Sequence, residues 1–153
     1  MYHKILFPTD GSENAEKAGR HALWIARASD ADILVLNIYE LYSPRMAALP
    51  LNIVPASNES LYEPLMEEAN NIVEEFKANL ERIEHEEGYK EIEITTAVKE
   101  GKPYHEIIKT IEEEGIDLVV MGASGRHGID RITLGSVTER VVRDSKKPVM
   151  VIP

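Results

Sequence analysis

The stretch Lys4-Ile5-Leu6-Phe7-Pro8-Thr9-Asp10-Gly11-Ser12 decides the fold class, because it passes from an apolar run of strand length into a turn and the start of a helix. Ser12 belongs to the residue types that cap helices, and the positions after it place small and apolar side chains on one helical face: Ala15, Ala18, Ala22, Ile25 and Ala26. A strand that leads directly into such a helix is typical of βαβ units and a parallel sheet.

The same alternation of strand and helix continues along the chain. Further strands are expected at about 32–39, 92–97, 116–121 and 148–152, and further helices from about 65 to Gly88, from Pro103 to Gly115 and from about Ser136. These elements predict one Rossmann-like α/β domain over residues 1–153. We expect a doubly wound, five-stranded parallel sheet in the order 3-2-1-4-5, with helices on both faces.

The composition excludes several classes of protein. The chain has 153 residues, 43% of them hydrophobic and 29% charged, which is the balance of an ordinary soluble domain. No apolar stretch approaches the ~20 residues that a membrane helix needs, and no signal peptide is expected. The absence of cysteine excludes disulfides, thiolate catalysis and the usual zinc sites, and the five histidines are scattered without metal-ligand spacing. We therefore expect a cytoplasmic protein with no metal-ligating residues and no membrane partner.

The net charge of −10 argues against a nucleic-acid partner, since phosphate binding needs a basic face. Many of the acidic residues fall in one segment, which we interpret as the solvated face of a long helix. They are Glu67, Glu68, Glu74, Glu75, Glu81, Glu84, Glu86 and Glu87. An anionic ligand must therefore be held by local backbone geometry against an unfavourable overall field.

The segment after the fourth strand combines three features that favour phosphate binding. Gly122 and Gly125 lack Cβ atoms, so backbone amides can come close to phosphate oxygens. The pair Gly135-Ser136 then opens the last helix, whose first amides and dipole favour an anion. The alternative is an ordinary strand-to-helix loop in which Ser136 is a simple N-cap.

The spacing of these glycines is neither that of a P-loop nor that of a dinucleotide fingerprint. It resembles the universal stress protein motif, in which Gly, two residues, Gly and nine residues precede Gly and a Ser or Thr; here these are Gly122, Gly125, Gly135 and Ser136. The resemblance extends to Phe7-Pro8-Thr9-Asp10 after the first strand and to the terminal stretch 147–152. Because the motif is kept, the chain resembles the ATP-binding branch of that family.

The resemblance implies ATP as the ligand, with Mg²⁺ or Mn²⁺ carried on its phosphates. It also implies a role for each matching position: an adenine wall at Pro8, Thr9 and Asp10, apolar contacts from Ile38 and Met121, a ribose and phosphate loop at Gly122, Gly125, Arg126 and His127, and a phosphate cradle at Gly135, Ser136, Val137 and Thr138. The function that this predicts is an ATP-binding regulatory protein of the stress response.

Two other functions stay open, namely a slow or partner-dependent ATPase and a nucleotide-independent interaction dimer. Hydrolysis needs a positioned base or a group that orients water. In the loop only His127 and Asp130 could serve, and neither has an orienting partner in the sequence. We therefore assign no catalytic residue and expect at most slow hydrolysis.

Three further expectations concern surfaces. The apolar strand from Pro148 to Ile152 carries no charge and lies at a sheet edge in the expected order, which predicts a homodimer, as the resemblance also implies. The segment from Leu41 to Glu59 is rich in proline and apolar residues, and we expect it either to cover the nucleotide or a partner surface or to pack on its own domain. Trp24 and Phe76, at helical spacing, are expected in the core.

Overall fold

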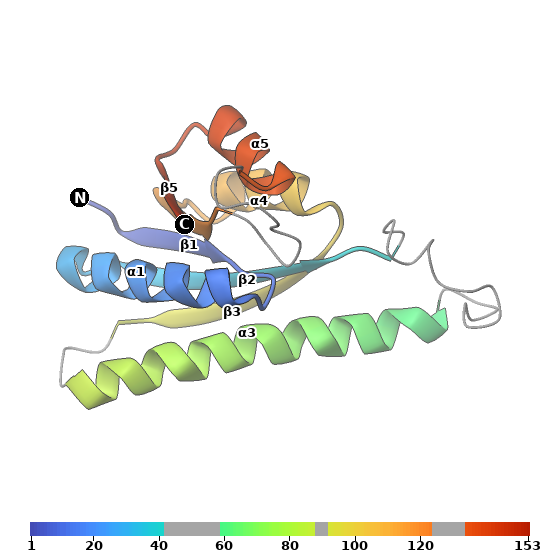
Figure 1. Ribbon diagram of the computed structural model, residues 1–153, viewed down its shortest axis with the longest axis horizontal. Coiled ribbons are helices and arrows are strands. Elements are labelled where there is room, and N and C mark those ends of the chain that lie inside the picture. Colours follow the sequence, from blue (N-terminus) through green and yellow to red (C-terminus); the bar gives the residue numbers. More distant parts are fainter. Residues whose placement is uncertain (42–58, 88–91, 124–133) are drawn as a thin grey trace.

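A five-stranded parallel sheet forms the centre of the molecule in a computed structural model that describes residues 1–41, 59–87, 92–123 and 134–153 (Figure 1). The strands lie in the order β3-β2-β1-β4-β5, with β1 at Lys4–Pro8, β2 at Asp32–Tyr39, β3 at Ile94–Glu100, β4 at Leu118–Gly122 and β5 at Val149–Ile152. The predicted fold class and strand order are confirmed.

The described helices cover both faces of this sheet (Figure 1). The helices α1 (Glu13–Ser29) and α3 (Glu59–Glu87) share one apolar core with one face, and α4 (Pro103–Glu113) and α5 (Ser136–Asp144) share a second core with the other. Adjacent residues of β1 divide between the two cores because strand side chains alternate. Phe7 packs edge-to-face on Phe76 with ring centroids 5.4 Å apart, whereas Leu6 packs with the α4 and α5 side.

The start of α1 agrees with the helix start that the sequence predicts. The Ser12 hydroxyl accepts a hydrogen bond from the Ala15 amide at 3.3 Å, so the predicted N-cap is confirmed. Farther along the helix, a Cβ added to Gly19 would lie 3.2 Å from the Phe7 ring. This close approach explains the glycine at position 19.

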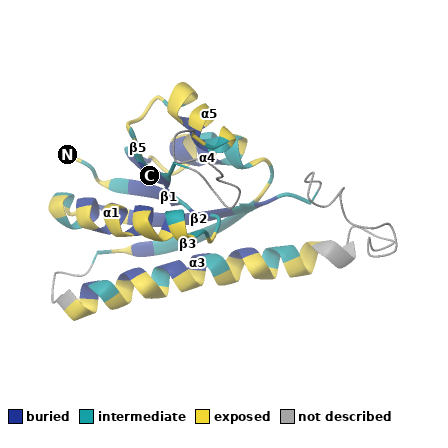
Figure 2. Ribbon diagram, in the orientation of Figure 1, coloured by how far each residue is buried: buried dark blue, intermediate teal, exposed yellow. Residues whose placement is uncertain are grey.

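Phe76 is buried as predicted, but the core position expected for Trp24 is wrong, because its side chain is 69% exposed. One side of α1 is mainly exposed (Figure 2), and the residues buried on this helix are Ala15, Ala18, Gly19, Ala22, Leu23, Ile25 and Ala26. The helix α3 begins at Glu59, earlier than expected, and therefore takes up the last residue of the loop expected from Leu41 to Glu59. Residues 42–58 of that loop lie outside the described residues. Within the described part of the chain, no helix has the length and apolarity that a bilayer crossing requires.

Candidate functional site

The candidate site lies at the carboxyl ends of β1 and β4, where the winding of the sheet reverses (Figure 1). The chain leaves β1 for α1 on one face and returns to β5 through α5 on the other. The pairing of Leu6 with Val119 brings Pro8 level with Met121 across the two strands. Ligands of open α/β sheets bind in the crevice outside such a switch point.

The turn after β1 is held in one shape by its own side chains and by β2. The Thr9 amide donates to the carbonyl oxygen of Leu36 at 2.9 Å, and the Thr9 hydroxyl accepts from the Gly11 amide at 3.2 Å. The Asp10 carboxylate accepts from the Ser12 amide at 3.1 Å. Gly11 has a φ of 77°, in the left-handed region that favours glycine. The predicted wall from Pro8 to Asp10 is therefore a rigid turn.

Asn37 is part of this arrangement, although the sequence did not identify it as a site residue. Its side-chain nitrogen donates to the Thr9 carbonyl oxygen at 2.7 Å, and both residues are only 6% exposed. A buried amide side chain needs such a partner. The signal that could have found it is a polar residue inside the otherwise apolar strand β2.

The end of β4 lies against the start of α1. A Cβ added to Gly122 would lie 3.4 Å from the backbone of Asn14, so this glycine keeps the strand end and the helix start in close proximity. The next residue, Ala123, donates its amide to the Ile152 carbonyl oxygen at 2.7 Å and accepts from the Gly135 amide at 2.7 Å. These two bonds fix the point where the chain leaves β4 and the point where it returns.

Gly135 is the N-cap of α5, with φ −60° and ψ 151°, and Ser136 is the first helical residue. The alternative in which Ser136 is a simple N-cap is therefore wrong. Because Gly135 has no side chain, the cap residue offers no acceptor to the first amides of the helix. The Thr138 hydroxyl, on a side chain that is 4% exposed, donates to the Gly122 carbonyl oxygen at 2.9 Å and ties the helix start to β4.

The structure places most of the predicted site residues at the switch point or near it. The end of β1 carries Pro8, Thr9 and Asp10. The end of β4 carries Gly122, which accepts the hydrogen bond from Thr138, and Ala123 next to it accepts the bond from Gly135. Ile38 is half-buried farther along β2, and Met121 is 5% exposed and packs mainly in the core beneath. Val137 is half-buried and Ser136 is exposed on the first turn of α5. Gly125, Arg126, His127 and Asp130 lie outside the described residues.

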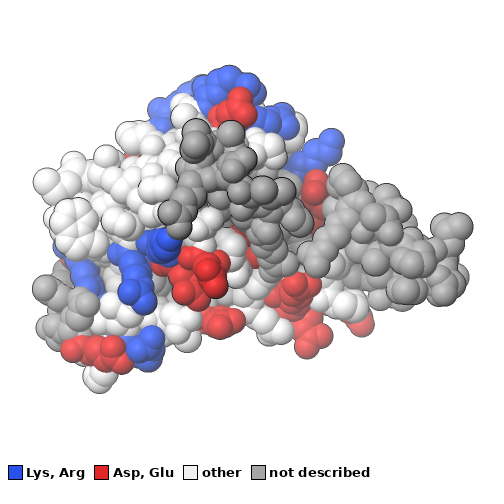
Figure 3. Space-filling view, viewed as in Figure 1, with Lys and Arg blue, Asp and Glu red and all other residues white. Residues whose placement is uncertain are grey.

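A polar network fixes the direction of α5 against α4. The Tyr104 hydroxyl donates to the Asp144 carboxylate at 2.7 Å, and the Arg140 guanidinium lies 3.9 Å from the centroid of the Tyr104 ring. The bond to Asp144 raises the pKa of Tyr104, and the same bond, with that from Arg143, lowers the pKa of Asp144. Lys and Arg side chains gather over α5 (Figure 3). Among the described residues, no group of three or more His, Asp or Glu could hold a metal ion.

Comparisons with known proteins agree with this arrangement. The family model described as "Universal stress protein family" matches residues 1–153. The universal stress protein MJ0577 of Methanocaldococcus jannaschii is 35% identical over 161 residues, which cover 99% of this chain and 95% of that protein. The universal stress protein MJ0531 of the same organism is 37% identical over 152 residues, which cover 99% of this chain and 82% of that protein.

Solved structures show the same likeness. The structure of MJ0577 superposes with a TM-score of 0.80 at 34% identity and covers 99% of this chain and 96% of that chain. A universal stress protein in complex with cAMP superposes with a TM-score of 0.60 at 26% identity, covering 99% of this chain and 96% of that chain.

Proposed function

The chain belongs to the universal stress protein family, and from this premise we propose that it binds ATP and acts as a regulatory protein of the stress response. The observation that carries the proposal is the convergence of the Thr9 turn, the end of β4 and the glycine-capped start of α5 at one switch point. A rigid wall on one side and a helix N-terminus on the other suit a ligand with a planar base and an anionic tail.

Each side of this site has a proposed task. The wall from Pro8 to Asp10, with Ile38, contacts the adenine, and the Asp10 carboxylate selects for donors on the nucleoside. The start of α5 receives the phosphates, because a cap without a Cβ lets oxygens approach the Ser136 and Val137 amides. Thr138 holds this helix start in place through Gly122. Gly125, Arg126 and His127 complete the phosphate side in this proposal.

A divalent cation fits the proposal only as an ion bound to the phosphates of the nucleotide. The described residues offer no acidic or histidine cluster for it, so Mg²⁺ or Mn²⁺ would come with the nucleotide. We assign no catalytic residue. Slow hydrolysis and cytoplasmic location stay predictions.

We also propose that two copies pair along β5. This strand pairs with β4 on one side, and β4 is its only neighbour in the described sheet. Met150 is 38% exposed, while Val149 and Val151 are half-buried. Antiparallel pairing about a two-fold axis would satisfy the edge backbone groups and cover these apolar side chains.

Mass spectrometry of the protein purified without added nucleotide tests the ligand. The native complex should carry one adenine nucleotide per chain, released as ATP or ADP on denaturation, and Gly135→Val purified in parallel should lack it. Recovery of FMN in place of an adenine nucleotide would contradict the proposal. Recovery of cAMP alone would identify the ligand as a cyclic monophosphate and would overturn the assignment of ATP.

A further inference from the structure

The phosphate side of the proposed site is bonded to the strand at the edge of the sheet. The Ala123 amide, directly after β4, donates to the carbonyl oxygen of Ile152 in β5 at 2.7 Å. The Ala123 carbonyl oxygen in turn accepts from the Gly135 amide, also at 2.7 Å. We call these two hydrogen bonds the β5 relay. Through them, one residue joins the last residue of β5 to the N-cap of α5.

A side-chain bond reinforces this connection. The Thr138 hydroxyl, in the first turn of α5, donates to the Gly122 carbonyl oxygen at 2.9 Å. Gly122 also lies opposite Ile152 in the parallel pairing of β4 with β5. The start of α5 is thus bonded to two consecutive residues, Gly122 and Ala123, that are both held against β5. A displacement of β5 therefore changes the support of the helix start.

The strand β5 is the least constrained strand of the described sheet. It has four residues and one neighbouring strand there, whereas β1, β2 and β4 each lie between two strands. The strand at the other edge, β3, has seven residues. Elements with few bonds to their surroundings open at a lower free energy than the centre of a sheet. The placement of the α5 cap therefore depends, through the β5 relay, on the strand that opens most easily.

Pairing with a second copy acts on the free side of this strand. The carbonyl oxygens of Pro148 and Ile152 both accept hydrogen bonds from β4. Backbone groups of successive residues point to opposite sides of a strand, so those of Val149 and Val151 face the free edge. An antiparallel partner strand bonds to these groups and so holds β5 from both sides.

We propose that pairing along β5 and nucleotide binding at the start of α5 strengthen each other, an inference that rests on the proposed function. Pairing holds β5, and the β5 relay then holds Gly135, so less freedom is lost when the phosphates bind to the helix start. A bound nucleotide holds the same helix start, and the relay then holds Ile152 for the partner strand. Coupling between two binding equilibria is reciprocal, so each favours the other by a related factor.

The wild-type protein tests this coupling without any substitution. If a paired copy binds ATP about fivefold more tightly than a single copy, the lower end of typical couplings, saturating ATP should lower the dimer dissociation constant about 25-fold, because a dimer has two sites. Sedimentation equilibrium of a dilution series, with and without ATP and Mg²⁺, measures the dimer dissociation constant. The result does not depend on how a variant alters β5.

Calorimetry measures the effect of pairing on ATP affinity. Val151→Lys, which places an ammonium group in the apolar edge strand, should bind ATP about fivefold more weakly than the wild type at concentrations above its dimer dissociation constant. Ala78→Lys is the matched control, because it adds the same charge at an exposed position of α3, which packs on β2 and β3. It should pair and bind ATP as the wild type does.

Hydrogen exchange measured by NMR reports on the β5 relay itself. In the absence of nucleotide, the Ala123 and Gly135 amides should exchange more slowly in the wild type than in Val151→Lys. The Gly101 amide donates to the Tyr39 carbonyl oxygen at 3.0 Å, beside the ends of β2 and β3, and should exchange equally in both proteins.

Several results overturn the coupling while ATP binding itself stands. They are a wild type that stays monomeric with and without ATP, a dimer dissociation constant that ATP leaves unchanged, equal ATP affinities of the wild type and Val151→Lys, and equal exchange of the relay amides in these two proteins. Absence of heat with ATP in both the wild type and Ala78→Lys contradicts the proposed function and, with it, the coupling.

Discussion

The side-chain amide of Asn37 donates a 2.7 Å hydrogen bond to the carbonyl oxygen of Thr9 and so joins β2 to the turn that follows β1. Both residues are almost fully buried, so water does not compete for the bond. The bond spans 28 positions of sequence and fixes a turn that carries no regular secondary structure of its own. The proposed adenine wall therefore depends on a residue that need not touch the base.

Replacing Asn37 by Leu should lower the free energy of unfolding by about 1–3 kcal/mol, because the Thr9 carbonyl oxygen loses its buried partner. It should also weaken ATP binding, since the turn from Pro8 to Asp10 is no longer held against β2. Urea denaturation and calorimetry measure the two effects. Asn37→Leu with unchanged stability and unchanged affinity would contradict the positioning role.

Thr138→Val tests the link between β4 and α5. Valine keeps the shape of the side chain but removes the donor to the Gly122 carbonyl oxygen. We expect a loss of about 1 kcal/mol in unfolding free energy and weaker ATP binding, because the helix start is less firmly placed. Thr138→Ser keeps the hydroxyl and should restore much of the affinity. If the Val and Ser variants bind ATP equally well, the hydroxyl has no role in positioning.

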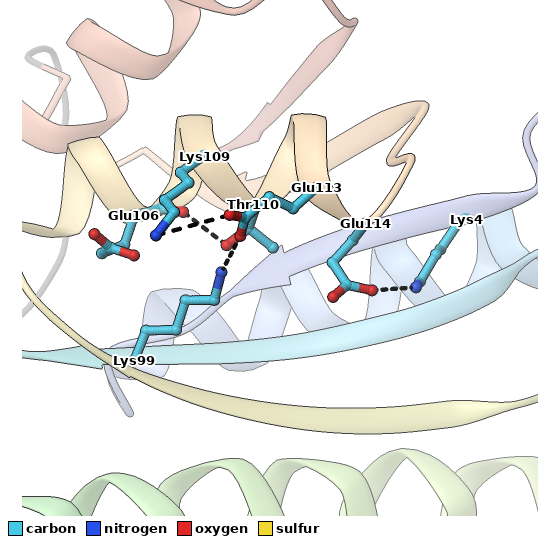
Figure 4. Close-up of polar contacts among 7 residues, drawn as sticks. All are labelled: Lys4, Lys99, Glu106, Lys109, Thr110, Glu113 and Glu114. Atoms are coloured by element: carbon cyan, nitrogen blue, oxygen red, sulfur yellow. Dashed lines mark hydrogen bonds and ion pairs between the residues drawn. The ribbon is translucent and has the colours of Figure 1, made fainter.

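Two lysine–glutamate pairs at the C-terminal end of α4 give the stability a pH dependence with a defined sign (Figure 4). The Lys4 ammonium donates to Glu114 at 2.8 Å and lowers the pKa of that carboxyl, and Lys99, at 3.0 Å, does the same for Glu113. A carboxyl whose pKa is lower in the folded state stabilises the protein above its unfolded pKa of 4.5. That contribution is lost as the pH falls through the lower folded value.

A carboxyl titration by NMR measures this effect. Glu114 should titrate below 4.5 in the wild type and closer to its ordinary value in Lys4→Met. The stability of Glu114→Gln should fall less steeply than that of the wild type as the pH decreases from about 6 to 3. Both carboxyls are exposed, so the difference in stability should be small and should weaken with added salt. A Glu114 titration unaffected by Lys4→Met would contradict the pairing.

Val151→Lys tests the proposed pairing along β5. A lysine ammonium placed within an apolar strand contact would have to be desolvated or would force the strands apart. The variant should shift sedimentation toward half the wild-type mass at the same concentration. Lys147→Met, just before the strand, serves as a control that alters charge without entering β5. An unchanged mass for Val151→Lys would place the interface on another surface.

Much of the fold could be predicted because its signals are local. The apolar runs of β1 and β2, the Ser12 cap and the small residues of α1 each specify their element without knowledge of distant parts of the chain. Right-handed crossovers restricted the strand order but did not fix it. Glycine spacing likewise identified the end of β4 and the start of α5 from the sequence.

The remaining features depend on tertiary contacts. The partner of Asn37 lies on another strand, so the sequence shows only that a polar residue interrupts β2. Trp24 was expected in the core on its helical spacing, but its neighbours Leu23 and Ile25 lie on the buried side of α1, while its own side chain is 69% exposed. The cap of α5 falls on Gly135 and not on Ser136, a shift of one residue that spacing alone does not resolve.

Calorimetric titration of nucleotide-free protein with ATP and Mg²⁺, beside GTP, FMN and cAMP, is the direct test of ATP binding at this site. We predict one ATP bound per chain, with weaker binding of GTP and none of FMN. It also predicts loss of ATP binding in folded Gly135→Val, because the φ of −60° accepts any residue while the added branches block the helix start. No heat with ATP, or ATP binding that Gly135→Val leaves intact, would contradict the assignment of this site to the nucleotide phosphates.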